Sequence, residues 1–373
     1  MKKLFILTFA ILFTNNSFVQ ANHKTFEYHF WGQNFFEVEG SKNYYKFEKN
    51  IVVDKDVKKA IDNSNKTGLI SYLLFENNTI IVDEQNLPTH IKSNFNLLRS
   101  NSVGKSLVSY VTGHAICEGY IDSVDVTLND WPLLNGTLYE GQKLIDILNM
   151  SAGDQKIIGE KNFKSDNKLK DGKINVNVMP VGVYLQSDLL QNTKKGKSVY
   201  NYNALATNVA MNYVIHKTGD DWEKLLHKVF NEYVKVETNV YFQQTTEKHQ
   251  KPKAGRYTFF ATRYDYLRIA KTMLDDWNND TCVGKYLKTI YEKRIKKNQK
   301  SEKNIGIFAY TKSYGGQFHF DVIGIKNRKI LGMDGYGGQQ VVIDFDKGRI
   351  IVVNSLDRHY DWYEIVYKKL KED

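Results

Sequence analysis

Cysteine is nearly absent from this chain, which excludes the architectures that depend on it. The 373 residues contain two cysteines, Cys117 and Cys282, too few for a disulfide framework or a cysteine-rich zinc site. Cys117 lies in an apolar stretch, where a free buried cysteine is the commoner state, although an oxidising compartment permits a bridge between the two. The nine histidines show no spacing typical of metal ligands. We therefore expect neither a metal nor a cofactor.

Proline is also scarce, with four residues in the whole chain, so no proline-rich linker separates domains. The sequence contains no internal repeat that would indicate a solenoid. Hydrophobic residues make up 42% of the chain and aromatic residues 13%, a composition typical of a globular protein rather than a disordered one. The length suits one large domain or two lobes.

Long apolar runs are also missing, with one short exception at the N-terminus. Two lysines precede the mostly apolar run Leu4 to Phe13, and Val19-Gln20-Ala21 follows as a small-x-small cleavage site. The run is shorter than the ~20 residues that span a bilayer, and polar residues come directly after it. We expect residues 1–21 to be a signal peptide removed on export, so that the mature protein is periplasmic or secreted and has no stable membrane anchor.

Acidic residues are outnumbered by basic ones, which gives a formal net charge of +10. Lysines and acidic residues are nevertheless interspersed, as Glu292 and Glu302 are within residues 285–303. This pattern favours a solvated basic surface, with weak attraction to anionic surfaces as the alternative. Because export also argues against nucleic acid, we expect a small-molecule partner. The sequence does not define an oligomeric state.

Strand-like segments occur towards both ends of the chain, and helical segments fill the middle. The first two strand-like segments are separated by Glu76-Asn77-Asn78, which indicates a hairpin. Residues 154–200 are rich in lysine, asparagine and glycine and are expected to be mostly loops. Strands are expected at 69–75, 79–83, 318–325, 339–344 and 349–354, and helices at 103–118, 144–150, 204–217, 222–233, 264–277, 285–297 and 362–370.

This order of elements predicts an α/β (α+β) fold, in which strands from both chain ends form an antiparallel sheet flanked by helices. The sheet lobe would comprise about residues 22–98 and 305–373, and a helical lobe about residues 99–304. A catalytic cleft between two such lobes follows naturally.

The sequence Ser102-Val103-Gly104-Lys105 has the pattern S-x-x-K at the start of an apolar helix. Residues three apart share one face of a helix, so a lysine there can take the proton of the serine. The helix N-terminus also favours a developing oxyanion. Ser165 to Lys168 has the same pattern, but its surroundings are those of a solvated loop. The alternative for Ser102 is a helix N-cap beside a surface lysine.

A second set of motifs matches the pattern of the class A β-lactamases. Ser102 to Lys105, Ser165-Asp166-Asn167 and Lys217-Thr218-Gly219 give S-x-x-K, S-D-N and K-T-G in the expected order. K-T-G must lie on an edge strand beside the nucleophile, whereas residues 217–219 follow a helical run and read as its C-terminus. A further K-T-G at Lys66 to Gly68 shows how readily the tripeptide occurs in a lysine-rich chain. We therefore reject this assignment.

Three segments together resemble the β-lactamase-related serine hydrolases. They are Leu97 to Ile121 (LLRSNSVGKSLVSYVTGHAICEGYI), Ile145 to Gly153 (IDILNMSAG) and Gly335 to Gln339 (GYGGQ). This family includes class C β-lactamases, D-aminopeptidases, certain esterases and the 6-aminohexanoate-oligomer hydrolases, and the resemblance covers roughly residues 69–356. It implies a β-lactamase/transpeptidase-like fold and an acyl-enzyme formed on Ser102 with Lys105 as base.

The resemblance also implies a catalytic tyrosine ahead of a helix. In the segment Lys195 to Ala204 (KGKSVYNYNA), Gly196 opens the pattern, Tyr200 takes the aromatic place and Tyr202 the catalytic one. The family pattern Y-x-N would require asparagine at 204, where this chain has alanine, and Tyr200 therefore remains an alternative.

The same resemblance places Met333-Asp334-Gly335 where classical β-lactamases have K-T-G, and Asp334, Gly335 and Gly337 at the substrate. Tyr336 would supply the second oxyanion-hole amide, with Ser102 supplying the first. Methionine at 333 removes the cation that holds the carboxylate of a penicillin, which argues against penicillin as the natural substrate.

Together these features predict an exported serine hydrolase that cleaves small amides or esters. One alternative is a β-lactamase or a peptidoglycan D,D-peptidase, which the expected compartment allows. Another is a penicillin-binding-type sensor that is acylated without turnover. The presence of Ser102, Lys105 and Tyr202 together favours the enzyme, and turnover as opposed to stoichiometric labelling would distinguish the two.

Overall fold

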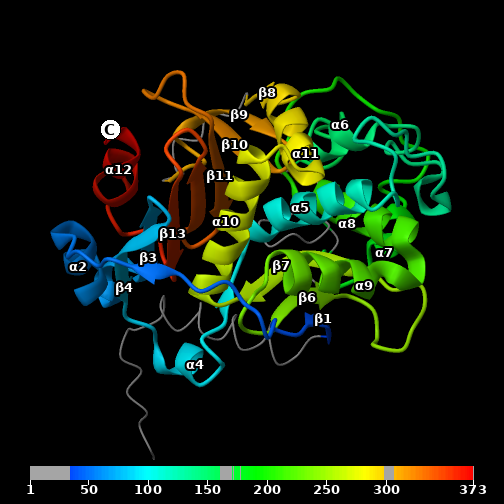
Figure 1. The fold of residues 1–373 in the computed structure, drawn as a ribbon. Helices are drawn as coiled ribbons and strands as arrows, with labels where there is room; N and C mark the ends of the chain where they lie inside the picture. Colours follow the sequence, from blue (N-terminus) through cyan, green and yellow to red (C-terminus); the bar gives the residue numbers. More distant parts are fainter. Residues whose placement is uncertain (1–33, 160–169, 171, 177, 298–305, 373) are drawn as a thin grey trace, which may run out of the picture.

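Strands from the N-terminal and C-terminal parts of the described chain lie in one large sheet (Figure 1). The structure is a computed structural model that describes residues 34–159, 170, 172–176, 178–297 and 306–372. The expected export signal lies outside these residues. Within them a nine-stranded sheet has the order β2-β4-β3-β13-β12-β11-β10-β9-β8. Its strands are β2 (Glu48–Lys49), β3 (Leu69–Glu76), β4 (Thr79–Gln85), β8 (Ile295–Lys296), β9 (Thr311–Gly315), β10 (Phe318–Val322), β11 (Ile330–Gly335), β12 (Gln339–Asp344) and β13 (Arg349–Ser355).

The C-terminal strand β13 lies beside the N-terminal strand β3 and pairs with it antiparallel. Residues on β13 alternate between two cores, because successive side chains of a strand point to opposite faces. Ile350 and Val352 belong to the larger hydrophobic cluster, and Ile351 and Val353 belong to a second cluster on the other face. Both faces are therefore covered, which explains why this strand is a continuous apolar run.

Helices cover both faces of the large sheet, which confirms the expected α/β architecture. Figure 1 shows α10 lying across one face. The last helical segment and α2 pack against the other face, where their apolar residues belong to the second hydrophobic cluster. The α-helices are α2 (Lys55–Asp62), α3 (Ser64–Thr67), α4 (Thr89–Lys92), α5 (Val103–Cys117), α6 (Leu144–Leu148), α7 (Val181–Leu185), α8 (Ala204–Thr218), α9 (Trp222–His227), α10 (Arg263–Asn278), α11 (Cys282–Glu292) and α12 (Lys368–Lys371).

Helix positions agree with the sequence expectations better than helix ends do. The helix expected at 285–297 begins at Cys282, because the Thr281 side chain caps it by accepting a hydrogen bond from the Gly284 N–H at 3.0 Å. It ends at Glu292, and strand β8 follows. The helix expected at 222–233 continues from α9 as a π-helical segment, Lys228–Tyr233.

A second sheet, which the sequence analysis did not anticipate, lies on the other side of α5. Its order is β1 (Asn34–Val38), β6 (Val240–Gln244), β7 (Gly255–Ala261) and β5 (Leu98–Arg99). It holds the segment just before Ser102 in place. The Ser100 N–H donates to the Phe259 carbonyl at 2.8 Å, and the Phe259 N–H donates to Ser100 Oγ at 2.9 Å. The division into a sheet lobe, at about residues 22–98 and 305–373, and a helical lobe, at about residues 99–304, remains a prediction.

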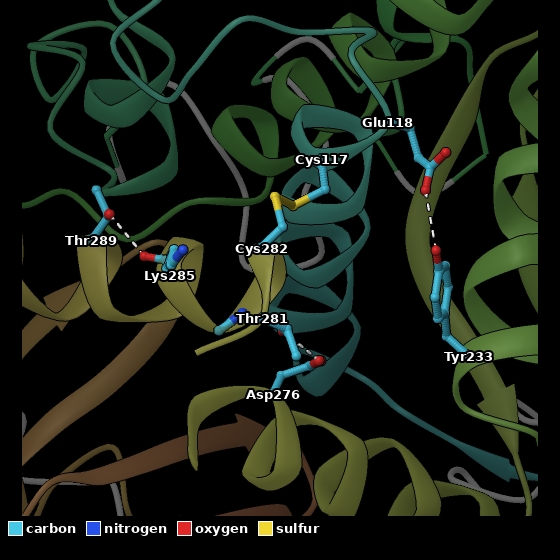
Figure 2. Close-up of a disulfide and its surroundings, with 9 residues drawn as sticks. Cys117, Glu118, Tyr233, Asp276, Thr281, Cys282, Lys285 and Thr289 are labelled. Atoms are coloured by element: carbon cyan, nitrogen blue, oxygen red, sulfur yellow. Dashed lines mark hydrogen bonds between the residues drawn. A yellow bond between two sulfur atoms is a disulfide. The ribbon is translucent and has the colours of Figure 1, made fainter. Parts of the chain in front are cut away.

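A disulfide joins Cys117 at the end of α5 to Cys282 at the start of α11, so the bridge is the one of the two states left open by the sequence that the structure shows (Figure 2). The two Cα atoms are 5.8 Å apart, although 165 positions separate them in the sequence. The helices meet closely because Gly113 has no side chain where the ring of Tyr286 packs, and Ser109 Oγ lies 2.7 Å from the Tyr286 hydroxyl. This contact brings the cysteines within bonding distance.

Among the described residues, no helix is long and apolar enough to cross a membrane. The same residues contain no group of three or more histidine, cysteine or acidic side chains that could hold a metal ion.

Candidate active site

Ser102 stands at the N-cap of α5, and its hydroxyl makes no capping bond to the helix backbone. Instead, Lys105 Nζ lies 3.0 Å from Ser102 Oγ. Lys105 is 3% exposed, so it is not the surface lysine that the alternative interpretation of this motif requires. A buried amine within hydrogen-bond distance of a serine hydroxyl is the geometry in which a proton can pass between them.

Gly104 allows this end of α5 to reach the second sheet. A Cβ atom at residue 104 would lie 1.9 Å from the carbonyl oxygen of Tyr257 on β7 and 2.7 Å from Ser100 Oγ. Any side chain would therefore push the helix away from the strand. The glycine within Ser-Val-Gly-Lys is a packing requirement, and it brings β7 to the base of the site.

Two tyrosine rings enclose the amine of Lys105. Its Nζ lies 3.8 Å from the ring centroid of Tyr257 and 5.0 Å from that of Tyr202. Within the described part of the chain, no carboxylate lies at ion-pair distance from this amine. The faces of aromatic rings attract a cation, so they can stabilise the protonated amine without a fixed counter-ion.

Tyr202 is placed by a buried carboxylate that its two polar neighbours share. Asn201 Nδ2 donates to Asp154 Oδ1 at 2.7 Å, and Asn203 Nδ2 donates to Asp154 Oδ2 at 3.1 Å. Asn203 also caps α8, because its side-chain oxygen accepts from the Ala206 N–H at 2.8 Å. The tyrosine is therefore anchored on both sides immediately before a helix.

The motif at 145–153 carries Asp154 to that position. Gly153 and Gly196 pack backbone against backbone, and the Gly196 N–H donates to the Gly153 carbonyl at 2.9 Å. A Cβ atom at residue 153 would lie 2.5 Å from the Gly196 carbonyl oxygen. The two segments that the sequence singled out separately are thus held against each other. The role of Asp154 was not recognised in the sequence, because nothing local distinguishes it from a loop aspartate.

Tyr202 and Tyr200 differ in what their hydroxyl groups contact. Burial raises the pKa of Tyr202, while the charge of Lys105 and a hydrogen bond with Ser102 act in the opposite direction. The Tyr200 hydroxyl is buried and has no hydrogen-bond partner among the described residues. The structure thus brings Tyr202, and not Tyr200, to Ser102 and Lys105.

Tyr257 is a member of this cluster that the sequence analysis missed. Arg256 Nη2 donates to its hydroxyl at 3.1 Å. Burial on its own raises the pKa of Tyr257, but the positive charges of Arg256, Lys105 and Arg99 outweigh it and lower the pKa to about 7. Strand β7 reads GRYTFFA, without the alternation that marks a strand from sequence, so no local signal placed this tyrosine beside Lys105 and Ser102.

The segment after β11 reaches the residues just before Ser102. A Cβ atom at Gly335 would lie 2.6 Å from the Ser100 carbonyl oxygen, and Asn101 Nδ2 donates to the Tyr336 carbonyl at 2.5 Å. A turn follows, in which the Gly338 N–H donates to the Gly335 carbonyl at 3.0 Å and Gly337 has φ 85°. This left-handed conformation favours glycine at the third position of the turn.

Met333 and Asp334 lie on opposite faces of β11. Met333 is 1% exposed and packs in the larger hydrophobic core. Asp334 Oδ2 accepts a hydrogen bond from the guanidinium of Arg358 at 2.6 Å. Although Met333 leaves this part of β11 without a lysine, the guanidinium of Arg358, from the segment after β13, lies close to it. This guanidinium is already paired with the Asp334 carboxylate.

The rejected class A assignment is inconsistent with the structure. Lys217 and Thr218 are the last residues of α8, and Gly219 follows as its C-cap, so this K-T-G does not lie on a strand. Lys66 and Thr67 end α3 in the same way, with Gly68 as the C-cap. Residues 165–168 lie outside the described part of the chain.

Solved structures of several hydrolases show the same fold. A Bacillus anthracis protein provisionally named a 6-aminohexanoate-dimer hydrolase is 14% identical, with a TM-score of 0.67 over 96% of both chains. A D-amino acid amidase from Ochrobactrum anthropi SV3 is 14% identical, with a TM-score of 0.58 over 84% of this chain and 99% of that one. A class C β-lactamase from Rhodobacter sphaeroides is 13% identical, with a TM-score of 0.53 over 85% of this chain and 100% of that one.

These comparisons confirm the β-lactamase-like fold that the motifs indicated. No protein-family model and no curated protein sequence matches the chain. At such low identity the likeness shows the fold, and the chemistry has to be argued from the side chains of this chain.

Tyr257 leads to a prediction about pH. Its pKa of about 7 means that phenolate forms as the pH rises through neutrality, whereas an ordinary tyrosine keeps its proton to ~pH 10. The unfolded chain holds the proton longer, so this group's contribution to the free energy of unfolding grows as the pH rises between those two values. Near-ultraviolet absorbance of the folded protein, titrated with base, measures the phenolate.

The matched control removes another buried tyrosine. Tyr257→Phe should lose the early phenolate step, and Tyr184→Phe should keep it, because burial raises the pKa of Tyr184. A wild-type titration without any tyrosine ionising below about pH 9 would contradict the prediction.

Proposed function

We propose that this protein is a serine hydrolase that forms an acyl-enzyme on Ser102, with Lys105 as its base. The observation that carries the proposal is the 3.0 Å contact between Lys105 Nζ and Ser102 Oγ, made by an amine that is 3% exposed. The fold supports it as well, since the solved structures that share it include an amidase and a β-lactamase.

In the proposed reaction, the hydroxyl proton of Ser102 moves to Lys105 Nζ as Oγ attacks the carbonyl carbon of the substrate. The N–H groups of Ser102 and Tyr336 bind the resulting oxyanion. Tyr202 passes a proton to the leaving group as its bond to the carbonyl carbon breaks. Tyr202 then takes a proton from water, which attacks the acyl-enzyme. As the bond between the acyl carbon and Oγ breaks, Lys105 Nζ returns its proton to Ser102 Oγ, and the enzyme is regenerated.

Simple esters and amides fit this site better than penicillins do. A penicillin carries a carboxylate that needs a cation, and the strand position that would supply one is occupied by buried Met333. Arg358 is close, but its guanidinium is already bound to the Asp334 carboxylate and to the Gly335 carbonyl. A β-lactamase or D,D-peptidase remains the second candidate, because the compartment we propose below contains peptidoglycan.

Labelling with a fluorophosphonate probe tests the nucleophile. Wild-type protein should be labelled at Ser102, as located by peptide mass mapping, because the buried amine beside it activates the hydroxyl. Ser102→Ala should not be labelled. Ser165→Ala, which removes the serine of the second S-x-x-K, is the control and should be labelled like wild type. Equal labelling of Ser102→Ala would refute the assignment.

Substrate class is tested by comparing kcat/KM for p-nitrophenyl butyrate and nitrocefin in the wild-type protein. One charge-assisted hydrogen bond contributes about 1.5–3 kcal/mol, or roughly one to two decades in rate. We expect the ester to be preferred by at least that factor, because buried Met333 offers no cation to the carboxylate of nitrocefin and the guanidinium of Arg358 is already bound to Asp334. Efficient nitrocefin hydrolysis with little ester activity would favour the β-lactamase, and stoichiometric labelling without turnover would favour the sensor.

We also propose that the protein acts in the periplasm or outside the cell. The short apolar N-terminal run and its cleavage site support export, and so does the Cys117–Cys282 bridge, because disulfides persist in oxidising compartments. The exported chain should begin at Asn22 and contain no free thiol. N-terminal sequencing and thiol titration of the exported fraction measure both. A chain that retains Met1 there would count against a cleaved signal.

A further inference from the structure

Two hydrogen bonds hold the peptide group between Gly335 and Tyr336, and a third holds the peptide group that follows it. Its carbonyl oxygen, on Gly335, accepts one hydrogen bond from Arg358 Nη2 at 2.5 Å and another from the Gly338 N–H at 3.0 Å. On the next peptide, the Tyr336 carbonyl accepts from Asn101 Nδ2 at 2.5 Å. Asn101 directly precedes Ser102, so the turn is tied to the segment that carries the nucleophile.

These bonds also fix the direction of an N–H group. In a planar trans peptide the C=O and N–H bonds point in opposite directions, so a held Gly335 carbonyl determines where the Tyr336 N–H points. Within the part of the chain that the structure describes, neither this N–H nor that of Ser102 has a hydrogen-bond acceptor. A guanidinium bound to the carbonyl oxygen also polarises the peptide, which makes the N–H a stronger donor.

Arg358 is itself held in place for this contact. Its guanidinium binds Asp334 Oδ2 at 2.6 Å, and Asp334 directly precedes Gly335 on β11. The ion pair therefore ties the guanidinium to the strand whose carbonyl it binds. The arginine side chain is 18% exposed, so it is largely shielded from water, and its bonds are correspondingly stronger than those of a surface arginine.

We propose that Arg358 is a positioning residue for the oxyanion site, which orients and polarises the Gly335–Tyr336 peptide so that the Tyr336 N–H can bind the acyl oxygen. This inference rests on the proposed acyl-enzyme mechanism and adds a residue to it. Arg358 lies after β13, outside the motifs that indicated the fold, and acts through the peptide rather than on the substrate. Its guanidinium is thus occupied by the protein instead of by a substrate carboxylate.

The variant Arg358→Met tests the inference in steady-state hydrolysis of p-nitrophenyl butyrate. Loss of a direct oxyanion donor lowers kcat about 10²- to 10³-fold, and loss of a group that orients one should lower it by about 10- to 100-fold. KM should change by less than about twofold, because the oxyanion bond strengthens only in the transition state. An unchanged kcat in folded Arg358→Met would overturn the inference.

A matched control separates this effect from the loss of any buried arginine. Arg349 is 3% exposed, binds Glu76 at 2.7 Å and donates to backbone carbonyls of the C-terminal segment, but it lies at the opposite end of β13. Arg349→Met should lower the Tm without lowering kcat. A fall in kcat as large as that of Arg358→Met would show a general structural effect and would overturn the positioning role.

Two further measurements test the inference even if Arg358→Met does not fold. Arg358→Lys keeps a positive charge beside Asp334 but loses the planar fork, so its kcat should lie between those of wild type and Arg358→Met, and a wild-type kcat would refute the inference. In Arg358→Ala, added methylguanidine should restore kcat, and failure to do so in a folded variant would count against it. A wild type that neither hydrolyses ester nor labels at Ser102 would overturn the proposed function, and this inference with it.

Discussion

The burial of one lysine amine beside a serine hydroxyl is the constraint on which the rest of this site depends. Removing an amine from water is costly unless other groups replace the lost solvation. In the described structure Lys105 has no carboxylate for this purpose, and the rings of Tyr202 and Tyr257 and the hydroxyl of Ser102 surround it instead. These contacts hold the Lys105 amine 3.0 Å from Ser102 Oγ, the position that a general base for this hydroxyl must occupy.

Each neighbour of that amine is held by a different part of the fold. Gly104 allows α5 to approach β7, which brings Tyr257 under the amine. Asp154 anchors the residues on both sides of Tyr202. Asn101 ties the turn after β11 to the segment before Ser102. The site is therefore built by backbone contacts between rigid elements, and several of its essential residues are glycine or asparagine rather than reactive groups.

Much of the architecture could be predicted from sequence, because long periodic segments such as 103–118 and 204–217 specify their own structure. The strands β3, β12 and β13 were also recognisable as apolar runs. The second sheet was not, since β6 and β7 carry glutamine, arginine and threonine that are buried by tertiary contacts alone. The disulfide likewise depends on tertiary contacts, because the spacing of two cysteines in the sequence does not predict that α11 packs on α5.

The predicted site was incomplete for a similar reason. Ser102, Lys105 and Tyr202 lie in motifs whose local spacing indicates chemistry, and the structure brings all three together. Tyr257, Asp154 and Arg358 act through contacts made across the fold, with bonds to residues that are distant in the sequence. Such residues have no local signature, so a single sequence without homologues does not distinguish them from ordinary strand or loop residues.

The pairing of β3 with β13 has a consequence for how the chain reaches its native state. Residues 69–75 cannot complete their pairing until residues 349–355 have been made. Strand β13 joins β3 to β12 in the sheet, and it is the last strand in the order of synthesis. Sheets with such distant pairings fold slowly, since the long intervening loop must close before its contacts stabilise it. During synthesis the growing chain therefore has an incomplete sheet, with the apolar edge of β3 unpaired, until almost the whole protein has been made.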